Sequence, residues 1–351
     1  MKNSFKKIGG FFQMKKIVGI LLAGAMALSA FAADLTGAVR LEGDLFKYNG
    51  DTEKVEALMI KANQQSYWGP LTLSISSDRA GGTLKMWDGG ADKLSVGKWA
   101  IWFKPMDMLK VNLGTIAKDL NKESIEYGGC LLGYDTFGAS LDINVDAFSA
   151  TIAVLPGSGS YWMTKEDGKK LVAGGLNLYA QYAADFGTIK AMFDFSNTFK
   201  DIKVAAGYNK SFGDISIWGD VAFIKLDEPS INTEDIFASR DTESLMVDFD
   251  VTYAKDAFNA QAYVQYDIKT FEEFDTDYQD LMLKAKVSYN MGSFTPYLVF
   301  VDKDLFAEDF ACMIKPGVTG SVGIMNYEVA VQFDVAKKVT VSVPFNASVN
   351  F

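Results

Sequence analysis

The sequence predicts an all-β protein, a transmembrane antiparallel up-and-down β-barrel of about 18 strands, with 16 strands as the alternative. Three observations carry this prediction. Apolar and polar residues alternate in many segments of about 8 to 13 residues. The connections between these segments are alternately short and long. Beyond the N-terminal region, no apolar run reaches the roughly 20 residues that a membrane-spanning helix needs.

Residues 1–32 predict a cleaved signal peptide, which leaves residues 33–351 as the barrel. Two lysines precede an apolar run over residues 17–28, which is too short for a membrane-spanning helix of roughly 20 residues. Ala30 and Ala32 then match the small-x-small pattern of a cleavage site. The chain is therefore predicted to be exported.

The C-terminal segment, residues 339–351, predicts the closing strand of the barrel. Successive side chains of a strand point to opposite faces, and here one face is wholly apolar. Thr340, Ser342, Pro344, Asn346, Ser348 and Asn350 form the other face. The apolar face carries Val339, Val341, Val343, Phe345, Ala347, Val349 and Phe351.

The same alternation predicts further strands along the chain. It covers residues 139–145, 189–195, 245–253, 258–268, 281–289 and 327–335. Pro316 and Pro344 fall inside predicted strands, where each removes one hydrogen bond of the ladder. A closed barrel has no free edge for them, so we expect β-bulges there.

The lengths of the connections support the barrel independently of the alternation. Short turns are predicted at residues 65–69, 104–108, 185–187, 212–214, 255–257 and 291–293. Long loops are predicted at residues 79–93, 118–136, 156–170, 226–243, 269–279 and 302–309. Bacterial barrels place short turns on the periplasmic side and longer loops outside. Counting the segments between these turns and loops gives 18 strands, and closure of the barrel requires such an even number.

The composition excludes several functions. Without residues 1–32 the chain loses five lysines and no acidic residue, so its net charge changes from −10 to −15. This charge argues against nucleic acid as a partner. The absence of histidine removes histidine-based catalysis and the commonest zinc ligand, so we expect no enzyme, no catalytic residue, no metal site and no cofactor.

Two questions stay open at this level. Translation can start at Met1 or at Met14, which itself precedes two lysines. Cys130 and Cys312 can form a disulfide in an oxidising compartment, or they can be two free thiols, which we favour.

Strand alternation also assigns the charges that face the lumen. A ring of carboxylates favours cations in a pore, and acidic side chains outnumber lysines on the inward face. The inward lysines are Lys110, Lys190, Lys203, Lys284 and Lys286. The inward acids are Asp142, Asp185, Asp194, Asp220, Asp248, Asp250, Asp267, Glu328 and Asp334.

With these features the chain resembles the Gram-negative porin family. The resemblance rests on the alternating strands, the phasing of turns and loops, and the terminal Phe351. The stretch Trp99–Val111 looks like a strand-turn-strand unit of porin-like proteins from spirochaetes and other diderms. It implies an outer-membrane location, a trimer, and contact with the assembly machinery through Phe345, Val349 and Phe351.

The resemblance also singles out residues 118–136, which join the fifth and sixth predicted strands. In general porins this third external loop folds into the lumen and narrows it. The acidic constriction motif of enterobacterial porins is absent here, so an ordinary external loop is an equal alternative. The candidate constriction residues are Lys118, Asp119, Lys122, Glu123 and Glu126.

The predicted function is a water-filled pore for passive diffusion of ions and small hydrophilic solutes, with a mild preference for cations. Outer-membrane lipids and these solutes are the expected partners. One alternative is a substrate-specific channel for sugars or peptides, for which the inward aromatics Tyr179, Trp218 and Tyr263 speak weakly. Another is a structural or adhesive surface barrel.

Overall fold

The computed structural model describes most of the predicted barrel. The described residues are 32–61, 71–88, 94–125, 131–155, 163–164, 170–171, 175–196, 201–225, 243–271 and 276–350. The predicted signal peptide up to residue 31, Glu126, Cys130 and Phe351 lie outside these ranges. Most of the predicted long loops at 156–170 and 226–243 do so as well.

Within the described residues the chain forms 23 strands, of which all but β10 and β11 belong to one sheet. The first twelve are β1 (Ala32–Thr36), β2 (Ala38–Asn49), β3 (Lys54–Lys61), β4 (Leu71–Ser76), β5 (Ala80–Asp88), β6 (Leu94–Met106), β7 (Leu109–Asp119), β8 (Gly133–Val145), β9 (Phe148–Leu155), β10 (Met163–Thr164), β11 (Lys170–Leu171) and β12 (Gly175–Ala184). The remainder are β13 (Gly187–Ser196), β14 (Asp201–Phe212), β15 (Ile215–Lys225), β16 (Glu243–Lys255), β17 (Phe258–Phe271), β18 (Thr276–Tyr289), β19 (Phe294–Asp302), β20 (Cys312–Val322), β21 (Met325–Ala330), β22 (Gln332–Val335) and β23 (Val339–Asn350).

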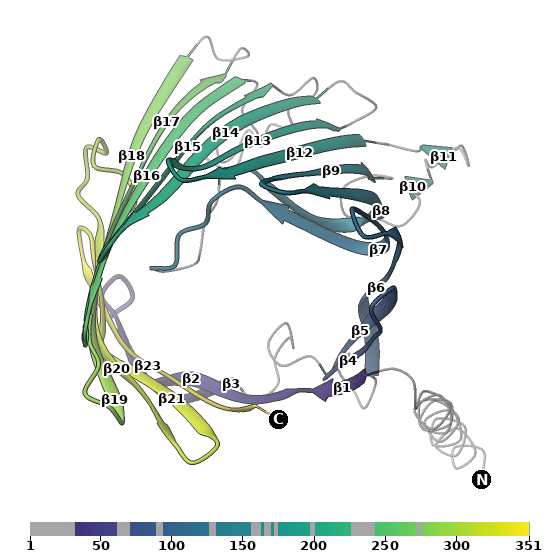
Figure 1. The fold of residues 1–351 in the computed structure, drawn as a ribbon. Helices are drawn as coiled ribbons and strands as arrows, with labels where there is room; N and C mark the ends of the chain where they lie inside the picture. The colour runs from purple at the N-terminus through teal and green to yellow at the C-terminus, as the bar shows by residue number, and fades with distance from the viewer. Residues whose placement is uncertain are drawn as a thin grey trace.

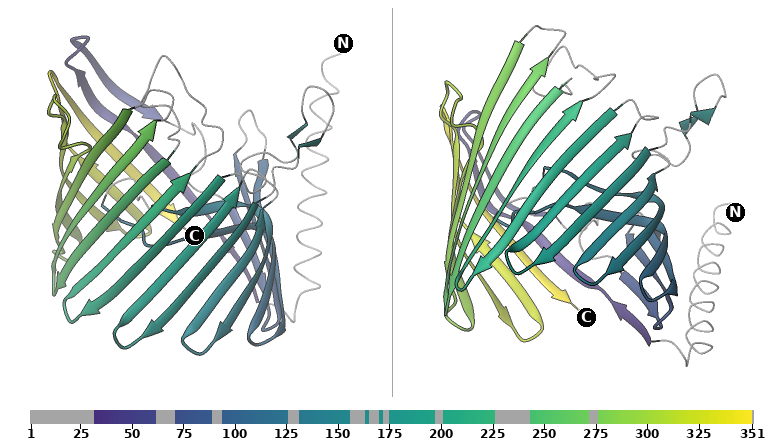
Figure 2. Two further views of the ribbon diagram at one scale, coloured as in Figure 1. Left: turned by 90° about the horizontal axis from the view of Figure 1, so that it is seen from above. Right: turned by 45° about the horizontal axis from the view of Figure 1, so that its top comes forward.

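The sheet closes into a ring (Figure 1). Its closing strand is β23, as predicted, and it pairs antiparallel with β2 from Ala38–Asn350 to Tyr48–Val341. Three pairs of strands each follow one path across the sheet: β1 with β2, β3 with β4, and β21 with β22. In the described part of the chain the 21 strands of the sheet therefore make 18 crossings, which agrees with the predicted number. Figure 2 shows these strands tilted across the barrel wall.

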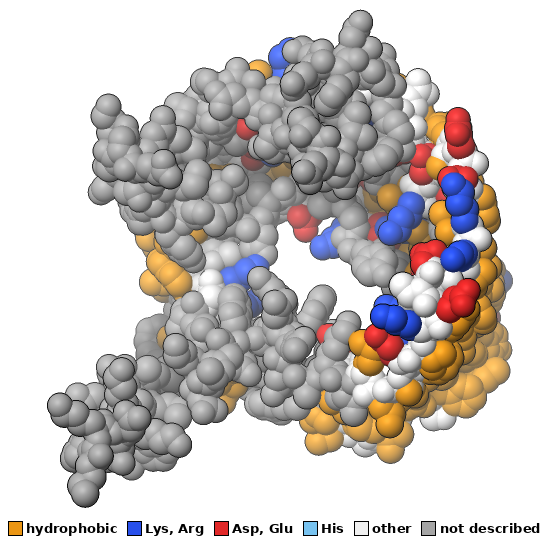
Figure 3. All heavy atoms as spheres, turned by 180° about the vertical axis from the view of Figure 1, so that it is seen from behind, with side chains coloured by type: hydrophobic (Ala, Val, Ile, Leu, Met, Phe, Trp, Pro, Cys, Tyr) orange, Lys and Arg blue, Asp and Glu red, His pale blue; other side chains and the backbone are white. Residues whose placement is uncertain are grey.

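The barrel wall has its apolar side outside and its polar side inside. In β16, Phe249 is 48% exposed, whereas the next residue, Asp250, is 1% exposed. The same contrast holds in β15, between exposed Val221 and buried Asp220. Figure 3 shows hydrophobic side chains over the outer face of the described wall, with acidic and basic side chains at its rim and inside. A water-soluble β-sandwich has the opposite arrangement, with its apolar faces packed together.

The short turns agree with the sequence, except near the N-terminus. Turns lie at 185–186, 213–214 and 256–257, each joining neighbouring strands of the ring. However, the predicted loop at 79–93 is wrong, because β5 occupies residues 80–88. Gly81 lets this strand form: a Cβ there would lie 2.6 Å from Nε1 of Trp102 on β6. A Gly-Gly pair that reads as a turn is here a close packing site for an indole.

The predicted turn at residues 65–69 lies outside the described residues, and the strands on either side of it, β3 and β4, run in the same direction. β3 pairs antiparallel with β2, and β4 pairs antiparallel with β1. Since β1 and β2 run on in one direction, β3 and β4 also share one direction. The reversal comes instead at residues 77–79, where the Ser77 N–H donates to the Ala80 carbonyl.

Both predicted strand prolines coincide with irregular pairing. The register between β2 and β23 shifts between Asp44 and Lys47, directly beside Pro344. Opposite Pro316 the partner strand breaks between β21 and β22, where the Val331 N–H donates to the Pro316 carbonyl at 2.9 Å. Each proline thus removes a donor from the ladder, and the neighbouring strand adapts. Cys312, at the start of β20, is a buried free thiol.

No helix within the described residues is long and apolar enough to cross a membrane. The short turns between described strands cluster at one end of the ring (Figure 2).

Candidate channel lumen and its inner loop

The segment that follows β7 enters the ring instead of leaving it (Figure 1). We call Leu120–Ile125 the inner loop; it belongs to the connection between β7 and β8. Leu120, Asn121, Glu123 and Ile125 are buried, although they lie in a connection. Apolar and polar contacts to the inner face of the barrel together explain this burial.

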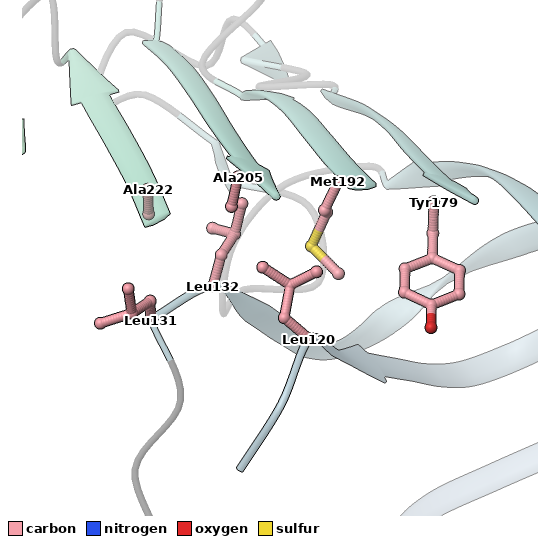
Figure 4. Close-up of a cluster of buried hydrophobic side chains, with 7 residues drawn as sticks. All are labelled: Leu120, Leu131, Leu132, Tyr179, Met192, Ala205 and Ala222. Carbon is pink, nitrogen blue, oxygen red and sulfur yellow. The ribbon is translucent and has the colours of Figure 1, made fainter. Parts of the chain in front are cut away.

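The first apolar contact lies at the start of the connection. Leu120, Leu131 and Leu132 pack against side chains from the inner faces of β12 to β15 (Figure 4). Those side chains are Tyr179, Met192, Ala205 and Ala222, one from each strand. Small residues on β14 and β15 make room for the leucines, so the strand wall is shaped to receive this loop.

The second apolar contact is made by Ile125 at the far end of the inner loop. Ile125 is 3% exposed and belongs to a buried cluster that extends from β17 to β21. Its other members are Tyr263, Tyr297, Val299, Val301, Met313 and Ala330. The inner loop therefore passes along the wall from β12 to β21 instead of contacting a single strand.

Asn121 links the inner loop to the wall by polar contacts. Its backbone N–H donates to Oδ2 of Asp220 at 3.0 Å, and its Nδ2 donates to Oδ1 of Asp220 at 2.6 Å. Lys190 donates to the Asn121 Oδ1 at 2.7 Å and to the Leu120 carbonyl at 2.9 Å. Gly207 makes this contact possible, since a Cβ at that position would lie 2.1 Å from Oδ1 of Asp220.

Glu123 forms a buried ion pair with Lys284 of β18. The Lys284 Nζ donates to Oε1 of Glu123 at 2.6 Å, and both side chains are less than a tenth exposed. The second carboxylate oxygen accepts the Ile125 N–H at 2.6 Å. Burial of two charges is tolerated when geometry and additional hydrogen bonds are good, as they are here. Breaking one side of such a pair leaves an uncompensated buried charge.

The wall beneath the inner loop carries a dense group of carboxylates. Asp248 accepts hydrogen bonds from the Asp220 N–H at 3.0 Å and from the Tyr263 hydroxyl at 3.1 Å. Asp250 accepts from Gln261 at 2.7 Å and from Thr252 at 3.1 Å. Neutral donors thus satisfy these acids without cancelling their charge.

The other predicted lumen charges lie on the same face. Asp194 and Asp267 are buried, and Asp142 accepts hydrogen bonds from Asn112 and Thr151. Gln332 donates to Asp334, while Lys286 stands 5.5 Å from the ring centre of Tyr297. Lys203 pairs with Asp194 in the register between β13 and β14. Glu328 pairs with Asn346, and Lys110 pairs with Asp142.

The assignment of Asp185 to the lumen is wrong. Asp185 is an exposed residue of the turn between β12 and β13, beyond the ends of both strands. Its carbonyl accepts a hydrogen bond from Lys210 at 2.8 Å. Strand alternation does not continue into a turn, and this is why parity fails at this position.

The five candidate constriction residues occupy different positions. Glu123 reaches into the barrel as described, and Lys118 lies 5.2 Å from the ring centre of Tyr179. Asp119 and Lys122 are exposed, and Glu126 lies outside the described residues. Sequence reasoning missed Asn121, Leu120 and Ile125. An apolar residue at each end of the polar stretch Asn121–Ser124 was the available signal.

The inward aromatics do not form an open slide. Tyr179 and Tyr263 do face inward, but the inner loop covers them, and they are 7% and 1% exposed. Trp218 packs against Tyr263 with ring centres 5.8 Å apart. The inner loop packs on these rings. They therefore do not form the aromatic path for sugars that the sequence weakly suggested.

A further set of lysines lines the wall on β5 to β7, away from the inner loop. Lys85 pairs with Lys98 in the register of β5 and β6, and Lys110 lies 5.1 Å from the ring centre of Trp102. Alternation does not identify Lys85 as an inward residue, because residues 79–93 are predicted as a loop. Among the described residues, no group of three or more His, Cys, Asp or Glu side chains is arranged to hold a metal ion.

Comparison with known proteins adds similarity of fold. No protein-family model matches this sequence, and no curated protein matches it. Among solved structures, OccK8 (OprE) of Pseudomonas aeruginosa aligns with a TM-score of 0.57 at 10% identity, over 92% of this chain and 98% of that one. OpdQ of the same organism aligns with a TM-score of 0.56 at 8% identity, over 91% and 98%. The outer membrane protein OpdK of P. aeruginosa aligns with a TM-score of 0.53 at 8% identity, over 91% and 99%. The chain is thus similar in fold to outer-membrane β-barrels of P. aeruginosa.

Proposed function

We propose that this chain is an outer-membrane channel for passive diffusion of ions and small hydrophilic solutes, narrowed by the inner loop. One observation carries the proposal: a closed barrel, apolar outside and polar inside, holds a connecting loop against its inner wall through Asn121, Glu123 and Ile125. A loop fixed in this way reduces the cross-section while leaving the rest of the lumen open.

The outer surface supports a membrane location. Large apolar side chains such as Phe193, Phe223 and Phe249 are at least 40% exposed, one residue in two along their strands. Contiguous apolar surface of this extent is rare on a soluble monomer. A lipid-facing band of alternating strands requires it. The similarity to OpdK and the other outer-membrane barrels agrees with this location.

The interior supports a channel instead of a solid plug. The described contacts of the inner loop run along the wall from β12 to β21. Figure 3 shows an opening at the centre of the barrel. Ions and small solutes would pass between the inner loop and the opposite wall.

The charges support a mild preference for cations. Asp220, Asp248, Asp250 and Glu123 gather on the loop side, where Lys190 and Lys284 are their nearest lysines. Lys85, Lys98 and Lys110 on β5 to β7 place positive charge on the other wall. Negative potential therefore exceeds positive potential only moderately, and the expected selectivity is weak.

A reversal potential tests both parts of this function. The purified protein is inserted into a planar bilayer under a KCl gradient, and single-channel currents are recorded. We expect discrete openings and a reversal potential displaced toward that of K⁺. Clear anion selectivity would overturn the assignment of the lumen charges, and the absence of openings would overturn the channel.

The lumen charges do not favour the molecules that are bound in two similar structures. OpdK has been solved with vanillate and OccK2 with glucuronate, both of which are carboxylates. The lumen of this chain presents many acids of its own, and the whole chain has only three arginines. Carboxylate solutes would meet repulsion near the inner loop, so we do not propose them.

We further propose that β23 directs insertion and that copies of the chain assemble in the membrane. Phe345 and Val349 pair with Gly43 and Val39 of β2, at the seam where the barrel closes. On this account the C-terminal strand presents its apolar face while the seam is still open. Removal of residues 1–32 would precede this step.

A further inference from the structure

The strands β19 to β23 form a second polar region inside the lumen, distant in sequence from the inner loop. A cavity of about 420 Å³ lies at the end of the barrel where the turns are. This volume falls in the range of small-molecule sites, roughly 300–1,000 Å³. Its lining is composed mostly of hydroxyl and amide side chains.

The strand register arranges these side chains in two rows. Thr295, Thr319, Glu328 and Asn346 are paired in succession across β19, β20, β21 and β23. One step toward the turns, Ser321, Asn326 and Ser348 form a second row in the same way. Hydroxyls and amides both donate and accept hydrogen bonds. Such a surface matches a solute whose neighbouring hydroxyls also donate and accept hydrogen bonds.

Asn346 gives an independent reason to expect a ligand. Its Oδ1 is buried and has no hydrogen-bond donor among the described residues. Buried polar atoms are nearly always paired in folded proteins, and an orphan needs an explanation. This oxygen is inaccessible in the present rotamer, and rotation of the Asn346 amide toward the cavity would let a solute hydroxyl supply the missing donor.

The neighbouring cavity continues this surface along β23. It has a volume of about 230 Å³, and it shares Glu328, Asn346 and no other lining residue with the first. Glu328 accepts a hydrogen bond from the Tyr297 hydroxyl, and Nζ of Lys315 lies 3.5 Å from Oε1 of Glu328. Lys315 therefore partly offsets the charge of Glu328, which is the one charged residue in the lining of the first cavity, so the first cavity is close to neutral. The second cavity is more acidic, since Glu42 and Asp44 also line it.

From these observations we propose a subsite for neutral polyhydroxylated solutes, such as a monosaccharide, on the inner face of β19 to β23. The proposal deepens the channel function and rests on it. Solutes of this class would be retained briefly at Asn346 after they pass the inner loop. Polymers of equal size without clustered hydroxyls would not be retained.

Single-channel recording in a planar bilayer tests the subsite. The K⁺ current is measured while D-glucose is added, and a polyethylene glycol of equal hydrodynamic size serves as the reference solute. We expect glucose to reduce the current at lower concentration than the polymer. Asn346→Leu should raise the half-blocking concentration of glucose about tenfold, the change expected for the loss of one to two hydrogen bonds.

Asn112→Leu, the same change on β7 of the opposite wall, is the matched control and should leave the glucose effect unchanged. Thr319→Val removes one hydroxyl without changing shape and should produce a smaller shift in the direction of Asn346→Leu. If glucose and polymer act alike on an otherwise conducting channel, the subsite is wrong and the channel stands. If no variant conducts, including the unmodified chain, the channel itself fails.

Two further outcomes would also overturn the subsite. One is a glucose effect that survives the double variant Asn346→Leu, Thr319→Val. The other is a block by CaCl₂ that exceeds the block by glucose and is relieved by Glu328→Gln, because that would identify a cation site.

Discussion

The two polar walls of the lumen differ in what their polar groups contact. The wall from β12 to β18 is covered by the inner loop, and its carboxylates accept hydrogen bonds from Asn121, Tyr263 and Gln261. On the wall from β19 to β23 the inner loop packs through Ile125, whereas the end near the turns, here called the open wall, lines a cavity where Oδ1 of Asn346 has no hydrogen-bond partner among the described residues. Oδ1 of Asn177 on β12 also lacks a partner among them. Polar groups of the first wall hold the inner loop, whereas hydroxyl and amide groups of the second wall remain available to solutes. One wall thus holds the loop that narrows the pore, and the other wall contacts the solutes that pass through it.

The largest change should come from the ion pair of the covered wall. Glu123→Ala leaves Lys284 buried without its carboxylate, and breaking a buried pair costs about 3–5 kcal/mol. We expect the inner loop to detach from β18, which would raise single-channel conductance and current noise. Recording in planar bilayers measures both quantities.

The double variant Glu123→Leu, Lys284→Met controls for this result. It removes both charges but keeps apolar volume at the contact, so the loop should stay seated and conductance should remain near that of the unmodified chain. A conductance that rises equally in both variants would show that the ion pair does not hold the loop.

A smaller change should follow from Asn121→Ala. The variant removes the side-chain contacts to Asp220 and Lys190, and each unpaired buried group costs about 1–3 kcal/mol. The loop remains fixed by Ile125 and Glu123, so we expect brief openings to a higher conductance level instead of a permanent increase. Ser124→Ala changes an exposed contact to Gln261 and is the control, with unchanged conductance expected.

The smallest change concerns ion selectivity and compares the two walls directly. Glu328 lies on the open wall, whereas Asp248 is 2% exposed beneath the inner loop. We expect Glu328→Gln to lower the K⁺-to-Cl⁻ permeability ratio roughly twofold, or about 0.4 kcal/mol. Asp248→Asn should lower it less, because permeating ions do not reach that side chain. Reversal potentials under a KCl gradient measure both ratios, and an equal effect would contradict the division between covered and open walls.

Particular segments show why the sequence predicted some parts of this structure and missed others. The strand over residues 258–268 is read from alternation alone, and β17 covers it. By contrast, β5 reads as a loop because its glycines are turn residues in isolation. Their role becomes visible only where Trp102 of β6 packs over Gly81. Long-range packing of this kind leaves no periodic signal.

The same limit applies to the candidate site. At the level of sequence, Glu123 was a candidate constriction residue implied by the resemblance, and alternation placed Lys284 on the inward face. It offered no means of pairing them, since they are 161 positions apart. Asn121 and Asp220 are 99 positions apart and were likewise not connected.

By itself, the sequence determined the all-β class and the closing strand at the C-terminus, predicted 18 crossings with 16 as the alternative, and assigned the two faces of the strands that it identified. These follow from period-two alternation and from loop length, which are local properties of the chain. Only the tertiary structure decided that the connection after β7 turns inward, that β3 and β4 share one direction, and that Asn346 lines a cavity. These features depend on which distant residues the closed ring brings together, because contacts across a barrel are set by register and not by neighbours in sequence.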